Sequence, residues 1–291
     1  MSWVSVTQPN GFLLCFVSVF MVVYLGNCVN GIPVVDLTHV QDSNTIFWPG
    51  NPQFNFTILY RGLTDGGYWY ESNAIQTPEH GGTHVDAPSH FAKDKLRIDQ
   101  IPMSKLCGPG VIINVKEKAR ANPDYRVQVS DLKVWEDKYG RIPDGAVVLM
   151  NSGWSDKYPN KTLTFGTESV NDPSTFHFPG WHEDAADWLV KNRNVNVVGV
   201  DTPSNDYGQS TTFDAHVILA TANINGLENV ANLDNIPEAG STIYVAVINL
   251  QDGSGGPARV FATNLDNSVN AASFSTSFKW VLALCILLTL G

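Results

Sequence analysis

Five short runs rich in valine and isoleucine recur along the middle of the chain, and they restrict its fold more than any other feature. The runs are VVDL near Val34, GVIINV near Val111, AVVLM near Val147, VNVVGVD near Val195 and TIYVAVINL near Ile243. Apolar runs of this length and β-branched content are typical of strands that are buried within a sheet. The sequence therefore predicts a sheet whose strands come from these runs.

Helical patterns separate some of the runs in the second half of the chain. SDLKVWEDKYG is expected to form a helix that Ser130 caps and Gly140 ends. HEDAADWLVKN, which begins at His182, carries acidic residues in its first turn and a base near its end, as helices do. Residues 32–265 show no linker, repeat or change of composition. We therefore expect one α/β domain in which a mixed sheet curls like a barrel and is flanked by helices.

The two ends of the chain look like targeting segments. The run FLLCFVSVFMVVYLG predicts a signal peptide over residues 1–31, cleaved near 28–31. No Lys or Arg precedes this run, so an uncleaved anchor is the alternative. Residues 266–291 hold small residues, a polar spacer and an apolar tail too short to span a hydrocarbon core of ~30 Å. This order predicts a GPI-attachment signal, with a short membrane anchor as the alternative.

Cysteine usage and two sequons agree with secretion. Two of the four cysteines, Cys15 and Cys285, fall in the terminal segments, so no disulfide framework is implied. Asn55 and Asn160 each begin an acceptor sequon for N-linked glycosylation. We expect a protein that is secreted or held at the extracellular face of the plasma membrane by its lipid anchor or C-terminal tail. A formal net charge of −10 without any basic run argues against a nucleic-acid partner.

The stretch HGGTHVDAPSH, from His80 to His90, places three of the seven histidines and an aspartate within eleven residues. His84 and Asp86, two residues apart, project from the same side of an extended segment. The two glycines after His80 allow the backbone to turn so that His80 folds back toward them, and Pro88 stiffens the exit. Two imidazoles and a carboxylate form a common ligand set for a divalent metal. The alternative is a polar loop whose histidines cap turns.

Extended by one residue, HGGTHVDAPSHF resembles the signature of the metal-dependent cyclase family, which includes bacterial kynurenine formamidases and isatin hydrolases. The likeness continues in chain order over nearly all of residues 32–265, through VVDLTH, FWPGNPQF, LMNSGW, VGVDTPSND, HVILATANINGLENV and GGPARVFA. It implies the swivelling β/α fold of that family and a homodimer.

The resemblance also implies a set of metal ligands. His80, His84 and Asp86 match the ligands of a first ion, and Asp86 matches a residue that bridges toward a second. His216 and Glu228 match the positions that complete a two-metal site. The implied cofactor is therefore a divalent metal, zinc or manganese, with one or two ions per chain.

Two further positions carry roles over from the family, and Ser204 is a candidate on its own chemistry. His90 matches the histidine assigned to proton transfer and is the expected general base. Trp48 matches an aromatic position that lines the pocket, although a Trp beside Pro-Gly also packs against turns. Ser204 offers a hydrogen bond to substrate, but serine after proline is also common turn chemistry.

The function implied is hydrolysis of an amide C–N bond in an aryl formamide or cyclic amide, by metal-activated water and a histidine general base. The expected substrate is a small aromatic amide similar to N-formylkynurenine or isatin. Two alternatives stay open: a lactone or cyclic-imide hydrolase with the same site, or a catalytically silent extracellular recognition protein that binds metal. The sequence has no G-x-S-x-G elbow and no P-loop.

Overall fold

The computed structural model describes residues 33–264, so the predicted signal peptide and GPI-attachment signal lie outside the described residues. The strands are β1 (Val35–Asp36), β2 (Asn55–Leu63), β3 (Trp69–Gln76), β4 (His84–Asp86), β5 (Cys107–Asn114), β6 (Arg126–Val127), β7 (Ala146–Asn151), β8 (Gly180–Trp181), β9 (Val195–Val200), β10 (Asn225–Glu228), β11 (Ala239–Val247) and β12 (Gly255–Thr263). The α-helices are α2 (Lys116–Ala121), α3 (Val129–Tyr139), α4 (Lys161–Phe165), α5 (Glu183–Asn192) and α6 (Asp214–Thr221). None of the helices in this part of the chain is long and apolar enough to cross a membrane.

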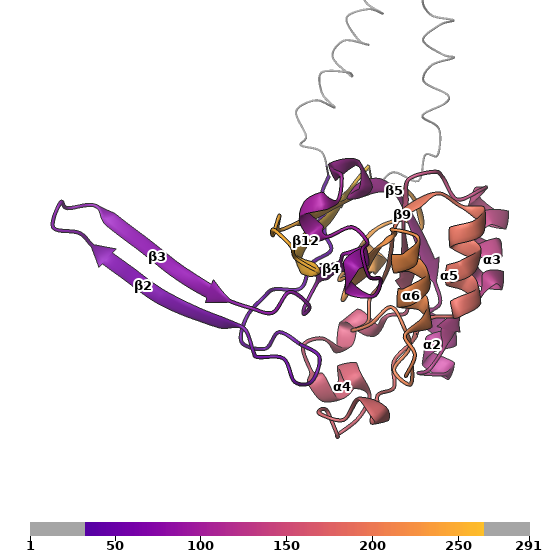
Figure 1. Cartoon of the computed structure of the whole chain (residues 1–291), viewed down its shortest axis with the longest axis horizontal. Coiled ribbons are helices and arrows are strands. Elements are labelled where there is room, and N and C mark those ends of the chain that lie inside the picture. Colours follow the sequence, from indigo (N-terminus) through magenta and orange to yellow (C-terminus); the bar gives the residue numbers. More distant parts are fainter. Residues whose placement is uncertain (1–32, 265–291) are drawn as a thin grey trace, which may run out of the picture. The chain divides into compact units, whose positions relative to one another are not determined.

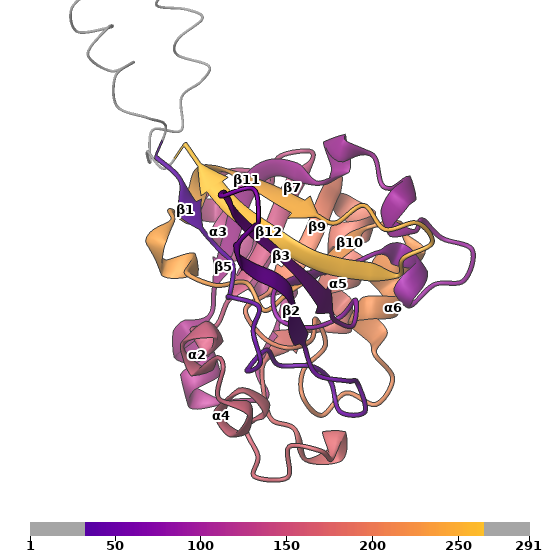
Figure 2. The same ribbon diagram turned by 90° about the vertical axis from the view of Figure 1, so that its left-hand side faces the viewer.

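The main sheet closes on itself. Its strands follow the order β1-β12-β11-β5-β7-β9-β10-β4, and β4 pairs again with β12. β4 pairs with the first part of β12, and β1 pairs with the last part of the same strand. The seven strands from β12 to β4 therefore form a barrel that β1 extends (Figure 2). β5, β7, β9 and β10 run parallel, while the remaining pairs are antiparallel. The predicted α/β domain with a mixed, barrel-like sheet is confirmed.

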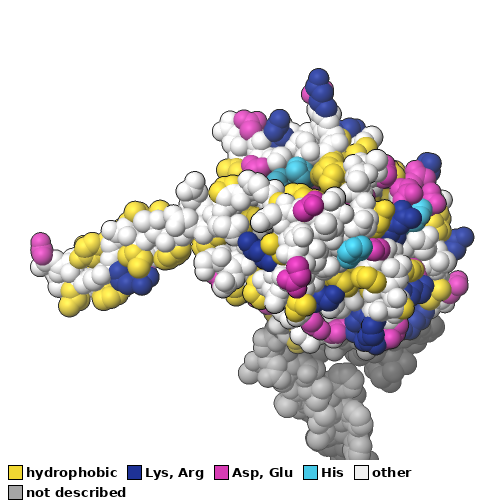
Figure 3. Space-filling view, turned by 90° about the horizontal axis from the view of Figure 1, so that it is seen from below, with side chains coloured by type: hydrophobic (Ala, Val, Ile, Leu, Met, Phe, Trp, Pro, Cys, Tyr) yellow, Lys and Arg dark blue, Asp and Glu magenta, His cyan; other side chains and the backbone are white. Residues whose placement is uncertain are grey.

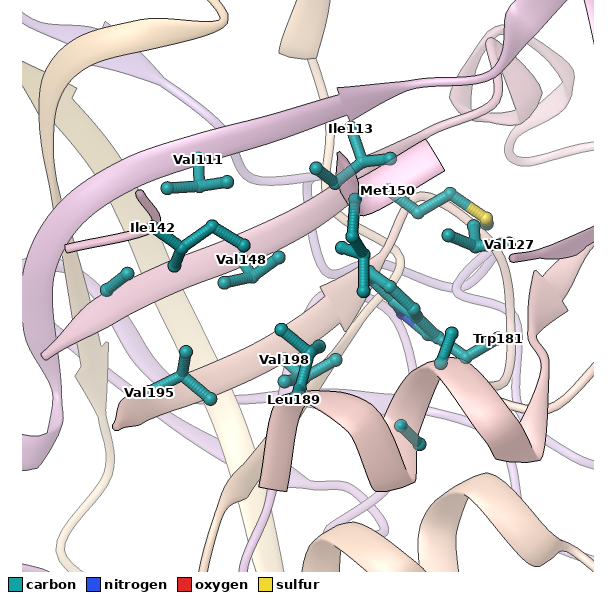
Figure 4. Packing of buried hydrophobic residues seen from close by; sticks show 14 of the residues in the cluster. Val111, Ile113, Val127, Ile142, Val148, Met150, Trp181, Leu189, Val195 and Val198 are labelled. Carbon is teal, nitrogen blue, oxygen red and sulfur yellow. The ribbon is translucent and has the colours of Figure 1, made fainter. Parts of the chain in front are cut away.

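Two apolar cores explain why the valine-rich runs are buried on both faces. Along β7, Val147 and Leu149 point into the barrel, whereas Val148 and Met150 point toward the helices. The outer core lies between the sheet and the helices α3, α5 and α6 (Figure 1), and Figure 4 shows Leu189 of α5 packed near the sheet residues. All five predicted runs contain strands, namely β1, β5, β7, β9 and β11.

The two predicted helices are present, and one begins earlier than expected. α5 follows His182, whose Nδ1 accepts a hydrogen bond from the backbone N–H of Asp184 at 3.1 Å. For α3 the prediction that Ser130 caps the helix is wrong, because Gln128 is the capping residue. The Asp131 carboxylate reaches back to accept from the Gln128 N–H at 2.8 Å, which completes a capping box two residues upstream.

A long β-hairpin, which we call the arm (residues 55–76, β2 and β3), projects from the barrel (Figure 1). β2 and β3 pair only with each other among the described strands. Strand register places an apolar set on one face of the arm, which it shares with Asn73 and the Arg61–Glu71 ion pair: Phe56, Ile58, Leu63, Trp69 and Ile75. All five of these side chains are at least half exposed, and Figure 3 shows hydrophobic side chains along the arm. The arm was not predicted from the sequence.

Candidate metal centre

Strand β4 carries His84 and Asp86, and strand alternation turns both side chains to the same side. Because β4 is paired along both edges, with β10 and β12, the two buried side chains have fixed positions. Just before β4, Gly82 has φ +56°, a conformation that glycine adopts without strain. The Gly82 carbonyl accepts a hydrogen bond from His84 Nδ1 at 2.9 Å. His84 therefore presents Nε2 to the centre, 3.2 Å from Asp86 Oδ1.

His80 folds back toward β4 as the glycine-containing turn predicts. Its Nδ1 lies 2.7 Å from Asp86 Oδ1. A side chain at Gly255 would collide with His80, because a Cβ there would lie 2.4 Å from His80 Cε1. The backbone of β12 can therefore approach the ring closely. One ligand atom each from His80, His84 and Asp86 lies within 4.8 Å of the others, which is a group that could hold a metal ion.

A second group shares Asp86 and adds residues from α6 and β10. His216 Nε2 lies 2.9 Å from Glu228 Oε1 and 3.4 Å from Asp86 Oδ2. Asp206 holds the other side of this ring, at 2.6 Å from Nδ1, and also accepts from the backbone N–H groups of Ala215 and His216 at the start of α6. Asp86, His216 and Glu228 likewise offer ligand atoms within 4.8 Å of one another. The structure thus brings all five predicted ligands together.

The charges of this centre fit a divalent cation. Burial lowers the pKa of His84, but the neighbouring carboxylates of Asp86 and Glu228 outweigh it and raise the pKa to about 9. Burial also lowers the pKa of His216, but the carboxylates of Asp206, Asp86 and Glu228 outweigh burial and raise this pKa well above its usual value. Asp86 Oδ2 is buried and has no hydrogen bond to any described residue. Buried carboxylates need a positive partner, and this nitrogen and oxygen set suits zinc or manganese.

His90 lies beside the first group, in a short 3-10 helix formed by Pro88–His90. Its ring stacks on that of His80, with 3.8 Å between ring centroids and 17° between planes. Burial lowers the pKa of His90 to about 4, although the negative charge of Asp86 opposes this. The imidazole is therefore neutral at pH 7, and a neutral ring can accept a proton.

A cavity of about 300 Å³ opens onto the two groups. Trp48 is in its wall and packs edge-to-face on Phe176, with ring centroids 5.3 Å apart. Ser204 is also in the wall, and its Oγ accepts a hydrogen bond from the Asp206 N–H at 3.2 Å. Both predicted substrate residues thus lie at the cavity, and their contact with substrate stays a prediction.

Sequence reasoning missed several residues of this site. Phe91 and Phe213 add aromatic rings to the cavity wall, and Asn51 adds a polar group. Phe91 directly follows the histidine stretch, so its position in the motif could have indicated it. Asp206 stands within VGVDTPSND, but no local pattern reveals that it holds His216.

The remaining predicted positions lie away from the centre. Asn55 and Asn160 are exposed, and the Oδ1 of Asn160 caps α4 by accepting from a backbone N–H at 3.0 Å. The other three histidines, His39, His177 and His182, are absent from both ligand groups and from the cavity wall.

Comparison with known proteins shows the family of this chain. A family model described as "Putative cyclase" matches residues 35–207. The chain is 29% identical over 246 residues to an isatin hydrolase of Roseibium aggregatum, covering 79% of this chain and 91% of that protein. It is 24% identical over 229 residues to a kynurenine formamidase of Salinibacter ruber, covering 78% and 95%. The solved structure of isatin hydrolase A from Ralstonia solanacearum aligns with a TM-score of 0.73 at 30% identity, covering 89% of this chain and 99% of that one.

Proposed function

We propose that this chain, which belongs to the cyclase family, hydrolyses and so opens a cyclic aryl amide. Like its relatives, it is a metal-dependent amidohydrolase that acts on C–N bonds other than peptide bonds. One observation carries the proposal: two ligand groups that share Asp86 open into a cavity walled by aromatic rings. No feature of residues 33–264 favours a lactone, a cyclic imide or a catalytically silent protein over this function.

The cavity wall supports an uncharged, flat substrate of the isatin type over one of the N-formylkynurenine type. Phe47, Trp48, Phe91 and Phe213 surround the space, and no Lys or Arg of the described chain lines it. The carboxylate of an amino-acid substrate would lose water there without a Lys or Arg partner, which is costly. A volume of about 300 Å³ accommodates a bicyclic ring.

The site residues divide the chemistry between them. His80, His84 and Asp86, with His216 and Glu228, would hold one or two ions of zinc or manganese. A divalent cation held there would lower the pKa of water toward ~7 and would polarise the amide carbonyl. His90, neutral at pH 7, takes the proton of the attacking water and returns it to the leaving nitrogen.

A homodimer is the proposed working state, and the arm supports it. A lone two-stranded ribbon is only marginally stable in water, so its apolar face needs a cover. Nine residues of β2 span roughly 30 Å, and two strands are roughly 10 Å wide, which gives about 300 Å² per face. A stable interface takes about 800 Å² per partner, so both arms and the adjoining barrel surface of a symmetric pair would contribute.

We also propose that the protein is secreted and glycosylated, and that a GPI anchor attaches it to the outer face of the plasma membrane. Asn55 pairs with Gln76 on the face of the arm opposite the apolar set, so a glycan there would leave the dimer contact free. Asn160 uses only its Oδ1 to cap α4, which leaves Nδ2 available. These positions support glycosylation of a secreted protein, and GPI anchoring stays a prediction from the C-terminal sequence.

The proposal is tested by measuring hydrolysis of isatin and of N-formylkynurenine with the purified protein, with metal, after chelation and after metal is restored. We expect turnover that chelation abolishes and zinc or manganese restores, with a higher kcat/KM for isatin. Metal binding without turnover of either compound would refute the proposed substrate class. Turnover that persists in fully chelated protein would refute the metal centre.

A further inference from the structure

His80 has contacts on both ring nitrogens, and only one of them faces the metal centre. Nδ1 faces Asp86, while Nε2 lies 2.9 Å from Ser254 Oγ. The Ser254 hydroxyl in turn donates to Glu79 Oε2 at 2.6 Å, and the Ser254 backbone N–H donates to the same oxygen at 3.0 Å. Ring, hydroxyl and carboxylate form a continuous hydrogen-bonded chain that leads away from the centre.

The direction of this chain follows from its last member. An ionised carboxylate can only accept, so the hydroxyl of Ser254 must donate to Glu79. The oxygen of Ser254 is then free to accept from His80 Nε2–H. This arrangement selects the tautomer in which the lone pair of His80 is on Nδ1, the nitrogen that faces Asp86.

We propose that Ser254 and Glu79 are positioning residues that fix the tautomer and the ring orientation of His80 as a metal ligand. The inference rests on the proposed function, because it requires that His80 binds metal. The other two histidines have the same arrangement, with Gly82 O behind His84 and Asp206 behind His216. An outer hydrogen bond of this kind is a regular property of metal-binding histidines.

The position of Ser254 is itself well determined. Its carbonyl accepts from the Ala87 N–H at 2.9 Å, which ties the turn before β12 to the residue after β4. The next residue, Gly255, lets the backbone pass directly against the His80 ring. The hydroxyl is thus held at one place relative to the ligand, although it comes from a segment 174 residues away.

The test measures the dissociation constant for zinc by competition with a chromogenic chelator, together with thermal unfolding of the metal-free protein. Ser254→Ala should weaken zinc binding about 10- to 100-fold, the usual effect of losing an outer partner. Ser254→Thr, which keeps the hydroxyl, should bind close to the wild type. Glu79→Gln should weaken binding as well, whereas Glu117→Gln, the same change at an exposed residue of α2, should have no effect.

The double variant Ser254→Ala/Glu79→Gln tests whether Glu79 and Ser254 act as one hydrogen-bonded series or independently of each other. Glu79 Oε2 also lies 3.8 Å from His80 Nε2, and the double variant tests whether that direct approach matters: if Glu79 acts through Ser254, the double variant binds zinc no more weakly than Ser254→Ala alone. If these hydrogen bonds merely stabilised the turn, the unfolding temperature of the metal-free protein would change and the dissociation constant for zinc would not. That result, or additive losses, would overturn the inference. A wild-type protein that binds no zinc would instead refute the proposed function. Should Ser254→Ala fail to fold, Glu79→Gln and Ser254→Thr carry the same test, because the Glu79 side chain is partly exposed.

Discussion

Replacing His90 by asparagine should remove the general base and leave the metal centre intact. The His90 ring stacks on His80 but belongs to neither group of ligand atoms. Asparagine is polar and similar in length to the inner part of the imidazole, so the 3-10 helix that ends with this residue can keep its shape. Metal content should therefore match the wild type while turnover falls.

The size of the loss follows from the environment of His90. Burial lowers its pKa to about 4, so at pH 7 only about one ring in a thousand is protonated. Nearly every molecule thus has the base in its active form. A base this far below the working pH is weak, so we expect the lower end of the usual 10²- to 10⁴-fold contribution. A 10²-fold loss of kcat corresponds to ~2.7 kcal/mol of transition-state stabilisation.

The assay is steady-state hydrolysis at saturating zinc from about pH 3 to pH 9, with metal content measured in the same samples. Wild-type kcat should fall as the pH drops through about 4, because protonated His90 can no longer accept a proton. The variant should lack this fall. His177→Asn, the same substitution at a partly exposed histidine paired with Asp124, is the matched control and should keep wild-type turnover.

Two results would refute the assignment. If His90→Asn, fully loaded with metal, turned over within about threefold of the wild type, His90 would not be the base. If the variant lost metal, the drop in rate would report on ligation, and His90 would be part of the centre itself.

Further predictions address the metal, the arm and a buried acid. His84→Ala should lose bound metal and unfold at a lower temperature, measured by metal analysis and thermal scanning; unchanged metal content would contradict its role as a ligand. Trp69→Glu, on the apolar face of the arm, should give a monomer in light scattering, whereas Ser72→Glu on the opposite face should not; a monomeric wild type would contradict the dimer. Burial raises the pKa of Asp201 to about 6, so the folded protein binds this proton more tightly than the unfolded chain and loses up to ~3 kcal/mol of stability as pH rises from about 4 through 6. Asp201→Asn should remove that dependence in urea unfolding at pH 4.5 and 7.5, and an unchanged difference would refute it.

Much of the ligand set could be predicted from sequence because its geometry is local. His84 and Asp86 share one side of a strand through alternation alone, and Gly82 supplies the turn that brings His80 back. The buried strands were equally predictable, because continuous valine-rich runs are typical of strands that are covered on both faces of the sheet. His216 and Glu228 were available only through the family resemblance, since an isolated histidine or glutamate carries no such pattern.

The remaining features depend on contacts between distant segments. Asp206 and Ser254 act through hydrogen bonds to rings elsewhere in the chain, which no spacing encodes. The arm was missed because its strands carry apolar residues on an exposed face, the reverse of the usual rule. At α3 the expected Ser130 cap was wrong, because the helix begins after Gln128, whose backbone N–H donates to the carboxylate of Asp131 in the first turn.

The position of the ligands in the barrel explains why metal and fold should be coupled. β4 is the strand that closes the barrel, pairing with β10 on one edge and β12 on the other. In this ladder His84 lies directly opposite Glu228, with His84 Nε2 3.6 Å from a Glu228 carboxylate oxygen. A cation held by both groups would therefore link β4 to β10 at the closing seam, and His216 would join α6 to them. Without it, the buried carboxylates at this seam depend on protons shared with the histidines, so loss of metal should loosen barrel closure before it disturbs the parallel strands β5, β7 and β9.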